Sequence, residues 1–497
     1  MFSLHTATNK KREAPSCLAA LKCVSLVATS LHLSACATSP ERSEAPVIDL
    51  PTVWTSQSDN TATTAWLADF NSPQLEAFVL EALAQSPSLK ATAARFAQSL
   101  AEARISGADL KPSAGIGLKP ARQKINTFGP SSTGGVIFEN YELTLDLRWE
   151  IDLWGRLRDQ TSAAVARVEG YQADLDAARL SLAAQTTKGW LKLIEAQQQL
   201  ALAEHTAEVY RSNQRALESR FKLGLIEGFD LRRIQTQVAS AEADALSRQR
   251  ALDQATRHLE AVLGRYPAGA LDAVSTLPSL PPTIPAGLPA DLIQRRPDLV
   301  ADERQLAATD RELRASKKDL LTQISLTASG GTSSQAFENL LDGNFSVWAL
   351  AGNLTQSIFQ GGRILANIDR SAALRDQAAA YYCDSAVRAF LEVETTLAAE
   401  KFIRLEQAKL FQAVEEASAA EALAWDRYRN GTGDFLSALD ATRTADAARS
   451  RLLGVTNLFL QNRVDLYLAL GGAFDPSAVI QPPPKTLKKL SSSTNDG

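Results

Sequence analysis

The residue types that most often carry catalysis or hold metals are scarce in this chain. It contains four histidines and four cysteines among 497 residues. Outside the first 35 residues the histidines are His205 and His258, which fall on different predicted helices among charged neighbours. The chain has no HExxH, GxSxG, GxxxxGK or CxxC pattern. We therefore expect no enzyme activity, no metal site and no cofactor.

Cys36 is the residue for which the sequence predicts covalent chemistry. Lys10–Arg12 precede a mostly apolar, uncharged stretch at 23–35, which is typical of a secretory signal peptide spanning residues 1–35. The segment Leu33–Cys36 resembles the lipobox of bacterial lipoproteins, and that resemblance implies a diacylglycerol on the Cys36 thiol. Ala37 in the next position implies sorting to the outer membrane. An ordinary signal peptide followed by a chance cysteine is the alternative.

Charge and hydropathy narrow the class of protein. The formal net charge is −4, and residues 1–35 carry four basic residues against one acid, so the remainder is more acidic than the whole. An acidic chain is a poor partner for nucleic acid. After residue 35 no apolar run reaches the roughly 20 residues that a membrane helix needs. If the chain crosses a bilayer, it must do so as a closed barrel.

The strongest structural signal is a strand with two different faces. From Tyr141 to Ile151 apolar residues alternate with polar or charged ones, which predicts a strand with one apolar face and one charged face. Gly155 ends the alternation, and from Arg156 onward Ala and Leu recur at helical spacing. We expect strands at about 113–128 and 136–152 that feed a long helix.

The whole passage occurs twice. Pro87 matches Pro297 at an offset of 210 residues, and three glycines recur at an offset of 207, namely Gly155 with Gly362, Gly224 with Gly431 and Gly264 with Gly471. Such constancy indicates a duplicated unit of helix, two strands and a helical hairpin. The predicted parts begin with a lipidated extended arm at 36–70, followed by a first repeat at 71–276 that contains a helical hairpin at 156–264. A proline-rich linker at 277–289 leads to a second repeat at 290–475, with strands at about 321–332 and 345–359 and a hairpin at 363–472. A disordered tail is predicted at 476–497.

The lengths of these elements indicate an assembly. Arg156 to Lys222 would form a helix ~100 Å long at 1.5 Å per residue, too long for a compact domain of this size. Four strands are too few for a barrel, whose smallest common form has about eight. Three copies of the chain would supply twelve.

Several motifs together carry a resemblance to a known family. These are Asp152–Arg158 (DLWGRLR), Arg295–Asp298 (RRPD), Phe359–Arg363 (FQGGR) and Tyr467–Gly472 (YLALGG). With the duplication, they make the chain resemble the TolC-like outer-membrane efflux family, in its lipoprotein branch. The resemblance implies a mainly α fold with a membrane portion, in which a homotrimer forms a 12-stranded β-barrel continued by an α-helical barrel. It also implies a passive exit duct that serves a resistance-nodulation-division type pump in the inner membrane, through a periplasmic adaptor (membrane fusion) protein.

Matching the chain to the family position by position implies roles for single residues. Leu436 and Asp440 match the residues that constrict the pore, and Asp434 lies close to the same turn. Ser437 stands where some members have a second acid, so the acidic ring is predicted to be single. Tyr428 matches a tyrosine that tethers the inner helix to its neighbour. The remaining sites are the strand-to-helix turns (Trp154, Gly155, Arg156, Gly361, Gly362, Arg363) and the hairpin-tip turns (Gly224, Gly431).

Some alternatives stay open at this point. The residues near the second hairpin tip could be ordinary helix caps or solvated helix ends. Lys317–Leu321 departs from the smaller, proline-containing family sequence before the third strand. The rival functions are the outer-membrane duct of a type I protein secretion system, a non-conducting coiled-coil scaffold lipoprotein, and a hydrolase with a site between subunits. Drug or solvent efflux is favoured by analogy with the lipoprotein branch.

The predicted lipidation is testable by labelling. A Cys36→Ser variant should lose incorporation of radiolabelled fatty acid, because only a thiol at that position accepts the diacylglycerol. Cys383→Ser is the matched control and should keep the label. Persistence of the label in Cys36→Ser would show that the signal is an ordinary one.

Overall fold

The duplication is visible in the lengths of the helices. The structure is a computed structural model, which describes Trp54 and residues 66–126, 135–272, 274, 276–279 and 295–472, all within the unit Ile48–Gly497. The paired helices are α3 (Pro87–Ala108) with α7 (Pro297–Lys318), α4 (Arg156–Lys222) with α8 (Arg363–Arg429), and α5 (Gly228–Val262) with α9 (Phe435–Ala469). Their lengths are 22, 67 and 35 residues in both repeats. The predicted repeat is confirmed.

The strands of both repeats form one sheet. Its strands are β1 (Ser113–Ile125), β2 (Val136–Ile151), β3 (Gln323–Ser334) and β4 (Ser346–Thr355), in the order β1-β2-β3-β4. All neighbours are antiparallel, and the β2–β3 pair joins the two repeats. Two short 3₁₀ helices, η2 (Phe337–Leu341) and η3 (Gly343–Phe345), connect β3 to β4. Among the described residues, β1 and β4 each have one unpaired edge.

The second pair of strands differs from the expected bounds of about 321–332 and 345–359: β3 lies two residues later, and β4 is shorter. The third strand begins at Gln323 because the Leu321 amide still donates to the carbonyl of Lys318 at the end of α7, at 3.0 Å. The fourth strand ends at Thr355 rather than near 359. The side chain of Gln356 donates to the Leu320 carbonyl at 2.7 Å, so residue 356 bonds to the turn before β3 instead of extending the ladder.

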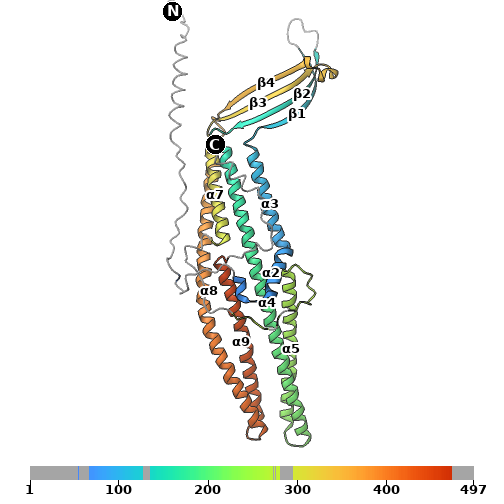
Figure 1. The fold of residues 1–497 in the computed structure, drawn as a ribbon, viewed down its shortest axis with the longest axis vertical. Coiled ribbons are helices and arrows are strands. Elements are labelled where there is room, and N and C mark those ends of the chain that lie inside the picture. Colours follow the sequence, from blue (N-terminus) through green and yellow to red (C-terminus); the bar gives the residue numbers. More distant parts are fainter. Residues whose placement is uncertain are drawn as a thin grey trace, which may run out of the picture. The chain divides into compact units, whose positions relative to one another are not determined.

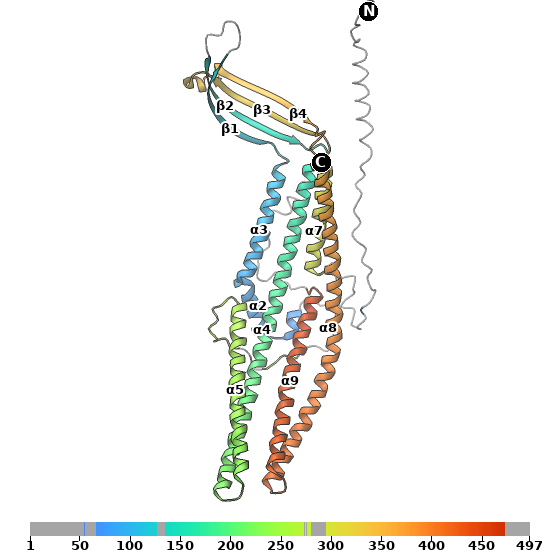
Figure 2. The ribbon, with the colours of Figure 1, turned by 180° about the vertical axis from the view of Figure 1, so that it is seen from behind.

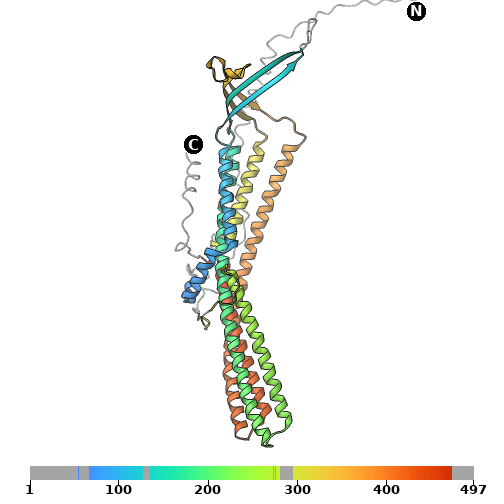
Figure 3. The ribbon, with the colours of Figure 1, turned by 90° about the vertical axis from the view of Figure 1, so that its right-hand side faces the viewer.

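The long helices α4 and α8 run from the sheet to the turns of the two hairpins (Figure 1). Near the sheet, α4 packs between α3 and α7, and α8 packs on α7. In the other half α4 packs on α5 and α9, and α8 packs on α9. Figures 2 and 3 show the two hairpins side by side, with both of their turns at the end away from the sheet. Only α4 and α8 run through both halves.

Two helices near the start of the described chain were missed by the sequence analysis. The expected extended arm at 36–70 includes a 3₁₀ helix, η1 (Trp66–Phe70), in which Trp66 is buried and stacks on Tyr467 with ring centroids 5.7 Å apart. α2 (Pro73–Gln85) follows, capped by Ser72, and packs against α4. Trp54 is also buried. Cys36, most of the predicted linker and the tail at 476–497 lie outside the described residues.

One backbone contact explains two of the sequence motifs. Gly471 has a φ of 65°, and a Cβ added there would lie 2.9 Å from the backbone of Arg295 and Arg296. In the first repeat Gly264 (φ 79°) lies against the backbone of Gln85, with an added Cβ at 3.3 Å. Each hairpin therefore ends with a glycine pressed against the chain that leads into α3 or α7.

Substitution of this glycine should destabilise the fold. Gly471→Ala imposes a left-handed backbone on alanine and a clash with Arg295, so the free energy of unfolding should fall by about 1–3 kcal/mol. A thermal shift of the detergent-purified protein measures this. Gly343→Ala is the control, since an added Cβ meets nothing within 4 Å there. Equal melting temperatures for the two variants would contradict the contact.

Candidate functional site at the hairpin tips

Both hairpins turn on a left-handed glycine. Gly224 has a φ of 71° and follows the end of α4, and Gly431 has a φ of 73° and follows the end of α8. A left-handed residue at this position lets orphan carbonyls of the last helical turn accept hydrogen bonds. The amide of Gly224 donates to the Phe221 carbonyl and that of Gly431 to the Tyr428 carbonyl. The two predicted tip glycines thus occupy equivalent turns.

The start of α9 presents two of the predicted constriction residues to the outside. Its inward face buries Phe435, Ala438 and Leu439, whereas Leu436 and Asp440, one helical turn apart, are exposed. The Asp440 carboxylate makes no hydrogen bond or ion pair with any residue that the structure describes. An exposed apolar side chain beside an unpaired carboxylate fits a surface that faces an aqueous axis.

Asp434 and Ser437 have a different role within the chain. Asp434 is the N-cap of α9: one oxygen accepts from the Ser437 amide at 2.8 Å and the other from the Ser437 hydroxyl at 2.6 Å. These two hydrogen bonds, first that of the hydroxyl and then that of the amide, lower the pKa of Asp434. For this pair the structure favours the capping interpretation over a free charge in a pore.

Tyr428 joins the two hairpins through its ring. It lies in an aromatic cluster with Phe435 and Trp425, with centroid distances of 5.4 Å and 5.8 Å. The guanidinium of Arg220, at the end of α4, sits 5.0 Å from the ring centroid. The buried hydroxyl of Tyr428 has no hydrogen-bond partner among the described residues. Inside one chain the contact is therefore a cation–π interaction, and sequence reasoning did not identify Arg220.

Part of the long contact between α4 and α9 is polar. Lys188 pairs with Asp465, and three hydrogen-bonded pairs follow toward the tips: Asn457 with Glu195 at 2.7 Å, Ser450 with Gln199 at 2.7 Å, and Thr206 with Asp446 at 2.9 Å. Burial raises the pKa of Asp446, and hydrogen bonds from Thr206 and Arg449 offset only part of this rise. Burial and the nearby Asp446 raise the pKa of Tyr210 to about 12. Polar pairs can exchange partners for water, so they hold this contact less firmly than the apolar residues of the two helices, which share two hydrophobic clusters.

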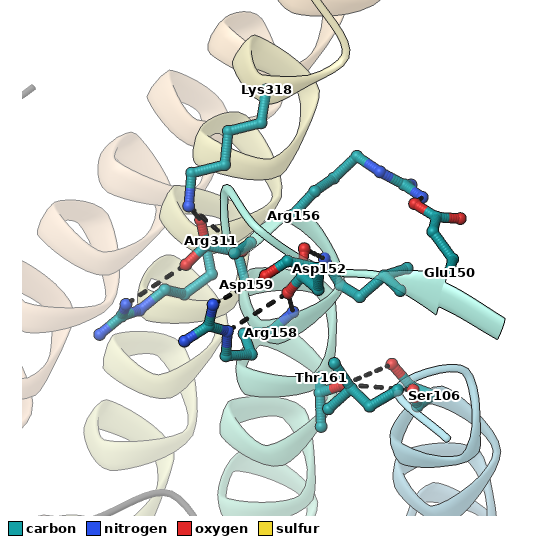
Figure 4. A network of polar contacts seen from close by, with 12 residues as sticks. Ser106, Glu150, Asp152, Arg156, Arg158, Asp159, Thr161, Arg311 and Lys318 are labelled. Atoms are coloured by element: carbon teal, nitrogen blue, oxygen red, sulfur yellow. Dashed lines mark hydrogen bonds and ion pairs between the residues drawn. The ribbon is translucent and has the colours of Figure 1, made fainter. Parts of the chain in front are cut away.

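At the sheet end, the first strand-to-helix turn is held by charged side chains (Figure 4). Gly155 is left-handed, with φ 75°, and Lys318 of α7 donates to the Gly155 carbonyl at 3.1 Å and to Asp159 at 2.6 Å. Asp152 accepts the first amides of α4, from Leu157 at 3.2 Å and Arg158 at 2.9 Å. The departure from the family pattern at Lys317–Leu321 thus supplies the lysine that fixes this turn.

Two further predicted residues complete the first turn. The Trp154 indole donates to the Thr322 carbonyl at 2.8 Å, across to the start of β3, and Arg156 bonds Glu150 at 2.5 Å. Burial would raise the pKa of Asp152, but the amides of Arg158 and Leu157 and the Arg158 side chain together hold it below its ordinary value. A charged carboxylate is therefore retained at the N-terminus of α4.

The second strand-to-helix turn is open. Gly361 and Gly362 are left-handed, with φ of 59° and 83°. Among the described residues the Arg363 guanidinium donates only to the side chain of Gln360, and the Arg363 amide donates to the Gln360 carbonyl at 3.1 Å. Phe359, two residues before the glycine pair, is 86% exposed. The structure thus places all the predicted turn residues in two equivalent turns, of which only the first is covered within this chain.

Comparison with known proteins places these features in a family. The sequence profile of the outer membrane efflux proteins matches residues 79–265 and 288–472, which correspond to the two repeats. The chain belongs to the outer membrane efflux protein family. This confirms the resemblance drawn from the motifs, and the family is defined by a transport role in the outer membrane.

Several outer membrane efflux proteins can be compared directly. Outer membrane protein OprJ of Pseudomonas aeruginosa is 30% identical over 464 residues, 91% of this chain and 96% of that protein. Toluene efflux pump outer membrane protein TtgF of Pseudomonas putida is 28% identical over 411 residues, 82% and 85% of the two chains. The outer-membrane channel OprN superposes with a TM-score of 0.79 at 25% identity, covering 86% of this chain and 98% of that one.

Two negative findings concern the described part of this efflux protein. No group of three or more His, Cys, Asp and Glu side chains there is arranged to hold a metal ion. None of the described helices has both the length and the apolar character needed to span a membrane.

The contact between the hairpin tips generates a prediction. Arg220→Ala removes a cation–π interaction worth about 0.5–1 kcal/mol at an exposed site, so the separated arrangement of the tips should gain population by roughly two- to fivefold. Single-channel recording in a planar bilayer should show more frequent or larger openings. Lys222→Ala removes a nearby positive charge without touching Tyr428 and should leave the openings unchanged. Identical traces for the two variants would contradict the role of Arg220.

Proposed function

We propose that three copies of this chain form a passive exit channel in the outer membrane that releases small molecules such as drugs or solvents. The observation that carries the proposal is the four-stranded sheet, which has two unpaired edges and one apolar face. An inner-membrane pump would deliver the compounds through a periplasmic adaptor protein. The known relatives that support this choice of cargo are named as toluene and solvent efflux pump outer membrane proteins.

The register of the sheet supports contact with lipid. Residues directly opposite one another share a face, and the pairs Ile116 with Leu145 and Ala328 with Leu350 place apolar side chains on one side. The other side carries charged pairs, such as Lys119 with Glu142 at 4.0 Å. The apolar residues are exposed to a degree that water would penalise: Ile116 80%, Trp348 82%, Leu350 65% and Leu354 74%.

The unpaired edges support threefold closure. In hydrocarbon each unpaired backbone amide or carbonyl costs several kcal/mol, so a spanning sheet must have no edge. A barrel needs about eight strands or more, and three copies of a four-stranded sheet provide twelve. The helices below the sheet would then continue the wall as a helical barrel with the hairpin tips at its far end.

The constriction is proposed at Leu436 and Asp440. In a threefold assembly three copies of each would surround the axis, giving an apolar ring next to an acidic one. Such an acidic ring attracts cations and repels anions. Because Asp434 is used as a helix cap and Ser437 is neutral, the ring contributed by this turn would be formed by Asp440 alone.

The competing functions make different predictions. A protein secretion duct would share the channel but would accept an unfolded polypeptide. A non-conducting scaffold would show no conductance at all in a planar bilayer. The apolar sheet face and the exposed Leu436 and Asp440 favour a channel over the scaffold.

Charge removal at the proposed constriction provides the test. Asp440→Asn keeps the size of the side chain and removes its charge, so reversal potentials in a salt gradient should shift toward lower cation preference. Glu227→Gln is the matched control, because Glu227 is an exposed acid near the tip of the first hairpin. Unchanged ion selectivity in Asp440→Asn would exclude this residue from the narrowest point, and absence of any conductance in the unmodified protein would exclude the channel.

A further inference from the structure

A groove lies between the two hairpins close to their tips. Its walls are the last turns of α4 and α8, with one side chain from α9, and its volume is about 570 Å³. Sites that hold small organic molecules measure roughly 300–1,000 Å³. On α4 the groove is lined by Asn213, Leu217 and Arg220, whose spacing of four and three residues places them on one face of the helix. The groove is therefore large enough for a small organic ligand.

Three hydrogen-bond donors in this groove have no acceptor among the residues that the structure describes. The amide nitrogen of Asn213 and the hydroxyl of Tyr428 are both buried and unbonded. The Arg220 guanidinium lies over the Tyr428 ring, and it makes no hydrogen bond or ion pair with a described residue. Because a buried donor without an acceptor is unfavourable, a ligand that brings acceptors into the groove gains affinity.

The charges in the groove wall do not cancel. Glu421 accepts a hydrogen bond from Arg449 of α9 at 2.8 Å, so this pair is neutral as a whole. Arg429 lies 3.9 Å from Asp426, which balances its charge. Within the described part of the chain, the charge of Arg220 has no such counterpart. The groove is therefore positive, and it favours a ligand that carries an acid group.

The rest of the wall suits an aromatic ring. The indole nitrogen of Trp425 donates to the Thr442 hydroxyl at 2.8 Å, so the ring is the part of Trp425 that remains for a ligand. The Trp425 ring meets the Tyr428 ring edge to face, with centroids 5.8 Å apart. Leu217 is buried and belongs to the apolar cluster at the tips. A planar ring can pack on these apolar groups while its substituents reach the donors.

We propose that this groove binds an amphipathic organic anion, in which an aromatic ring carries an acid group at one end and a second hydrogen-bond acceptor at the other. The acid group accepts from the Tyr428 hydroxyl beside the Arg220 guanidinium. Asn213 donates to the second acceptor, since it lies seven residues, about 10 Å, from Arg220 along α4. The ring packs on Trp425.

A ligand in this position touches both hairpins. Asn213 and Arg220 belong to α4, whereas Trp425 and Tyr428 belong to α8. The ligand therefore stabilises the arrangement in which the tips are joined. Its binding does not depend on the proposed channel, whereas its effect on conductance rests on the proposed function.

Calorimetric titration tests the site directly. The full-length protein in lipid nanodiscs is titrated with 6-methoxy-2-naphthoate, with empty nanodiscs as the blank, and should bind it saturably at one site per chain. Tyr428→Phe keeps the ring and removes only the hydroxyl, so the affinity should fall about tenfold, because a hydrogen bond to a charged group is lost. Asn213→Leu keeps a side chain of similar size and should lower the affinity about fivefold.

Matched variants and a matched probe serve as controls. Gln214→Leu changes an amide outside the groove lining, which donates to Glu218 at 2.7 Å, and Tyr171→Phe removes a hydroxyl in the sheet half of α4. Both should bind the naphthoate as the unmodified protein does. The neutral 6-methoxy-2-naphthalenemethanol should bind about tenfold more weakly than the naphthoate. Absence of saturable binding, equal affinity in all four variants, or equal affinity of the two probes would overturn the proposal.

Bilayer recording tests whether the ligand joins the hairpins. A ligand that binds only the joined arrangement favours it by a factor of one plus its concentration over Kd, so at ten times Kd openings should become about tenfold rarer. More frequent openings would contradict the joining role. If the naphthoate binds with the predicted pattern of variants but the unmodified protein never conducts, the proposed function fails and the binding site stands. If the protein conducts but binds no naphthoate, the proposed function stands and the site fails.

Discussion

The structure depends on the need to leave no sheet edge unpaired. The described part of one chain supplies four antiparallel strands with one largely apolar face, and the end strands β1 and β4 each keep one row of unpaired backbone groups there. In water such an edge would promote aggregation. In hydrocarbon its unpaired backbone groups would cost too much free energy for the sheet to be stable. The strands are therefore stable only as part of a closed assembly. The rest of the chain must hold the edge strands of neighbouring copies in the correct register.

The duplicated helices meet this need by repeating one geometry. Each repeat ends its strands at left-handed glycines, begins a 67-residue helix directly after them, and closes with a glycine pressed against the chain that leads into α3 or α7. The first turn is fixed by Lys318, which reaches from α7 to the Gly155 carbonyl and Asp159. Toward the tips, polar pairs, a shared apolar cluster and the cation–π contact of Arg220 with Tyr428 join the hairpins.

Much of the fold could be predicted from the sequence because its signals are local. Glycine ends both long helices, Ser86–Pro87 caps and starts α3, and the alternation from Tyr141 to Ile151 marks the two-faced strand. α2 carries the same Ser-Pro signal at Ser72–Pro73, and that signal was available but not used. The early end of β4 was not predictable, because it depends on a hydrogen bond from Gln356 to a residue 36 positions away.

The candidate site was less predictable than the fold. Asp434, Ser437 and Asp440 lie within two helical turns, yet the structure uses the first two as a cap and leaves the third unpaired. Arg220 and the polar pairs between α4 and α9 have no signature in the sequence, since their meeting depends on how the two hairpins pack. Family resemblance identified positions, whereas the contacts of the side chains required the structure.

The central claim is that the apolar face of the sheet meets lipid only after three copies close its edges. Native mass spectrometry of the full-length protein extracted in mild detergent tests it most directly. The account predicts a complex of three chains that precipitates when detergent is removed. A single chain that stays monomeric and remains in solution without detergent, after its N-terminal residues through Cys36 have been cut away, would contradict it.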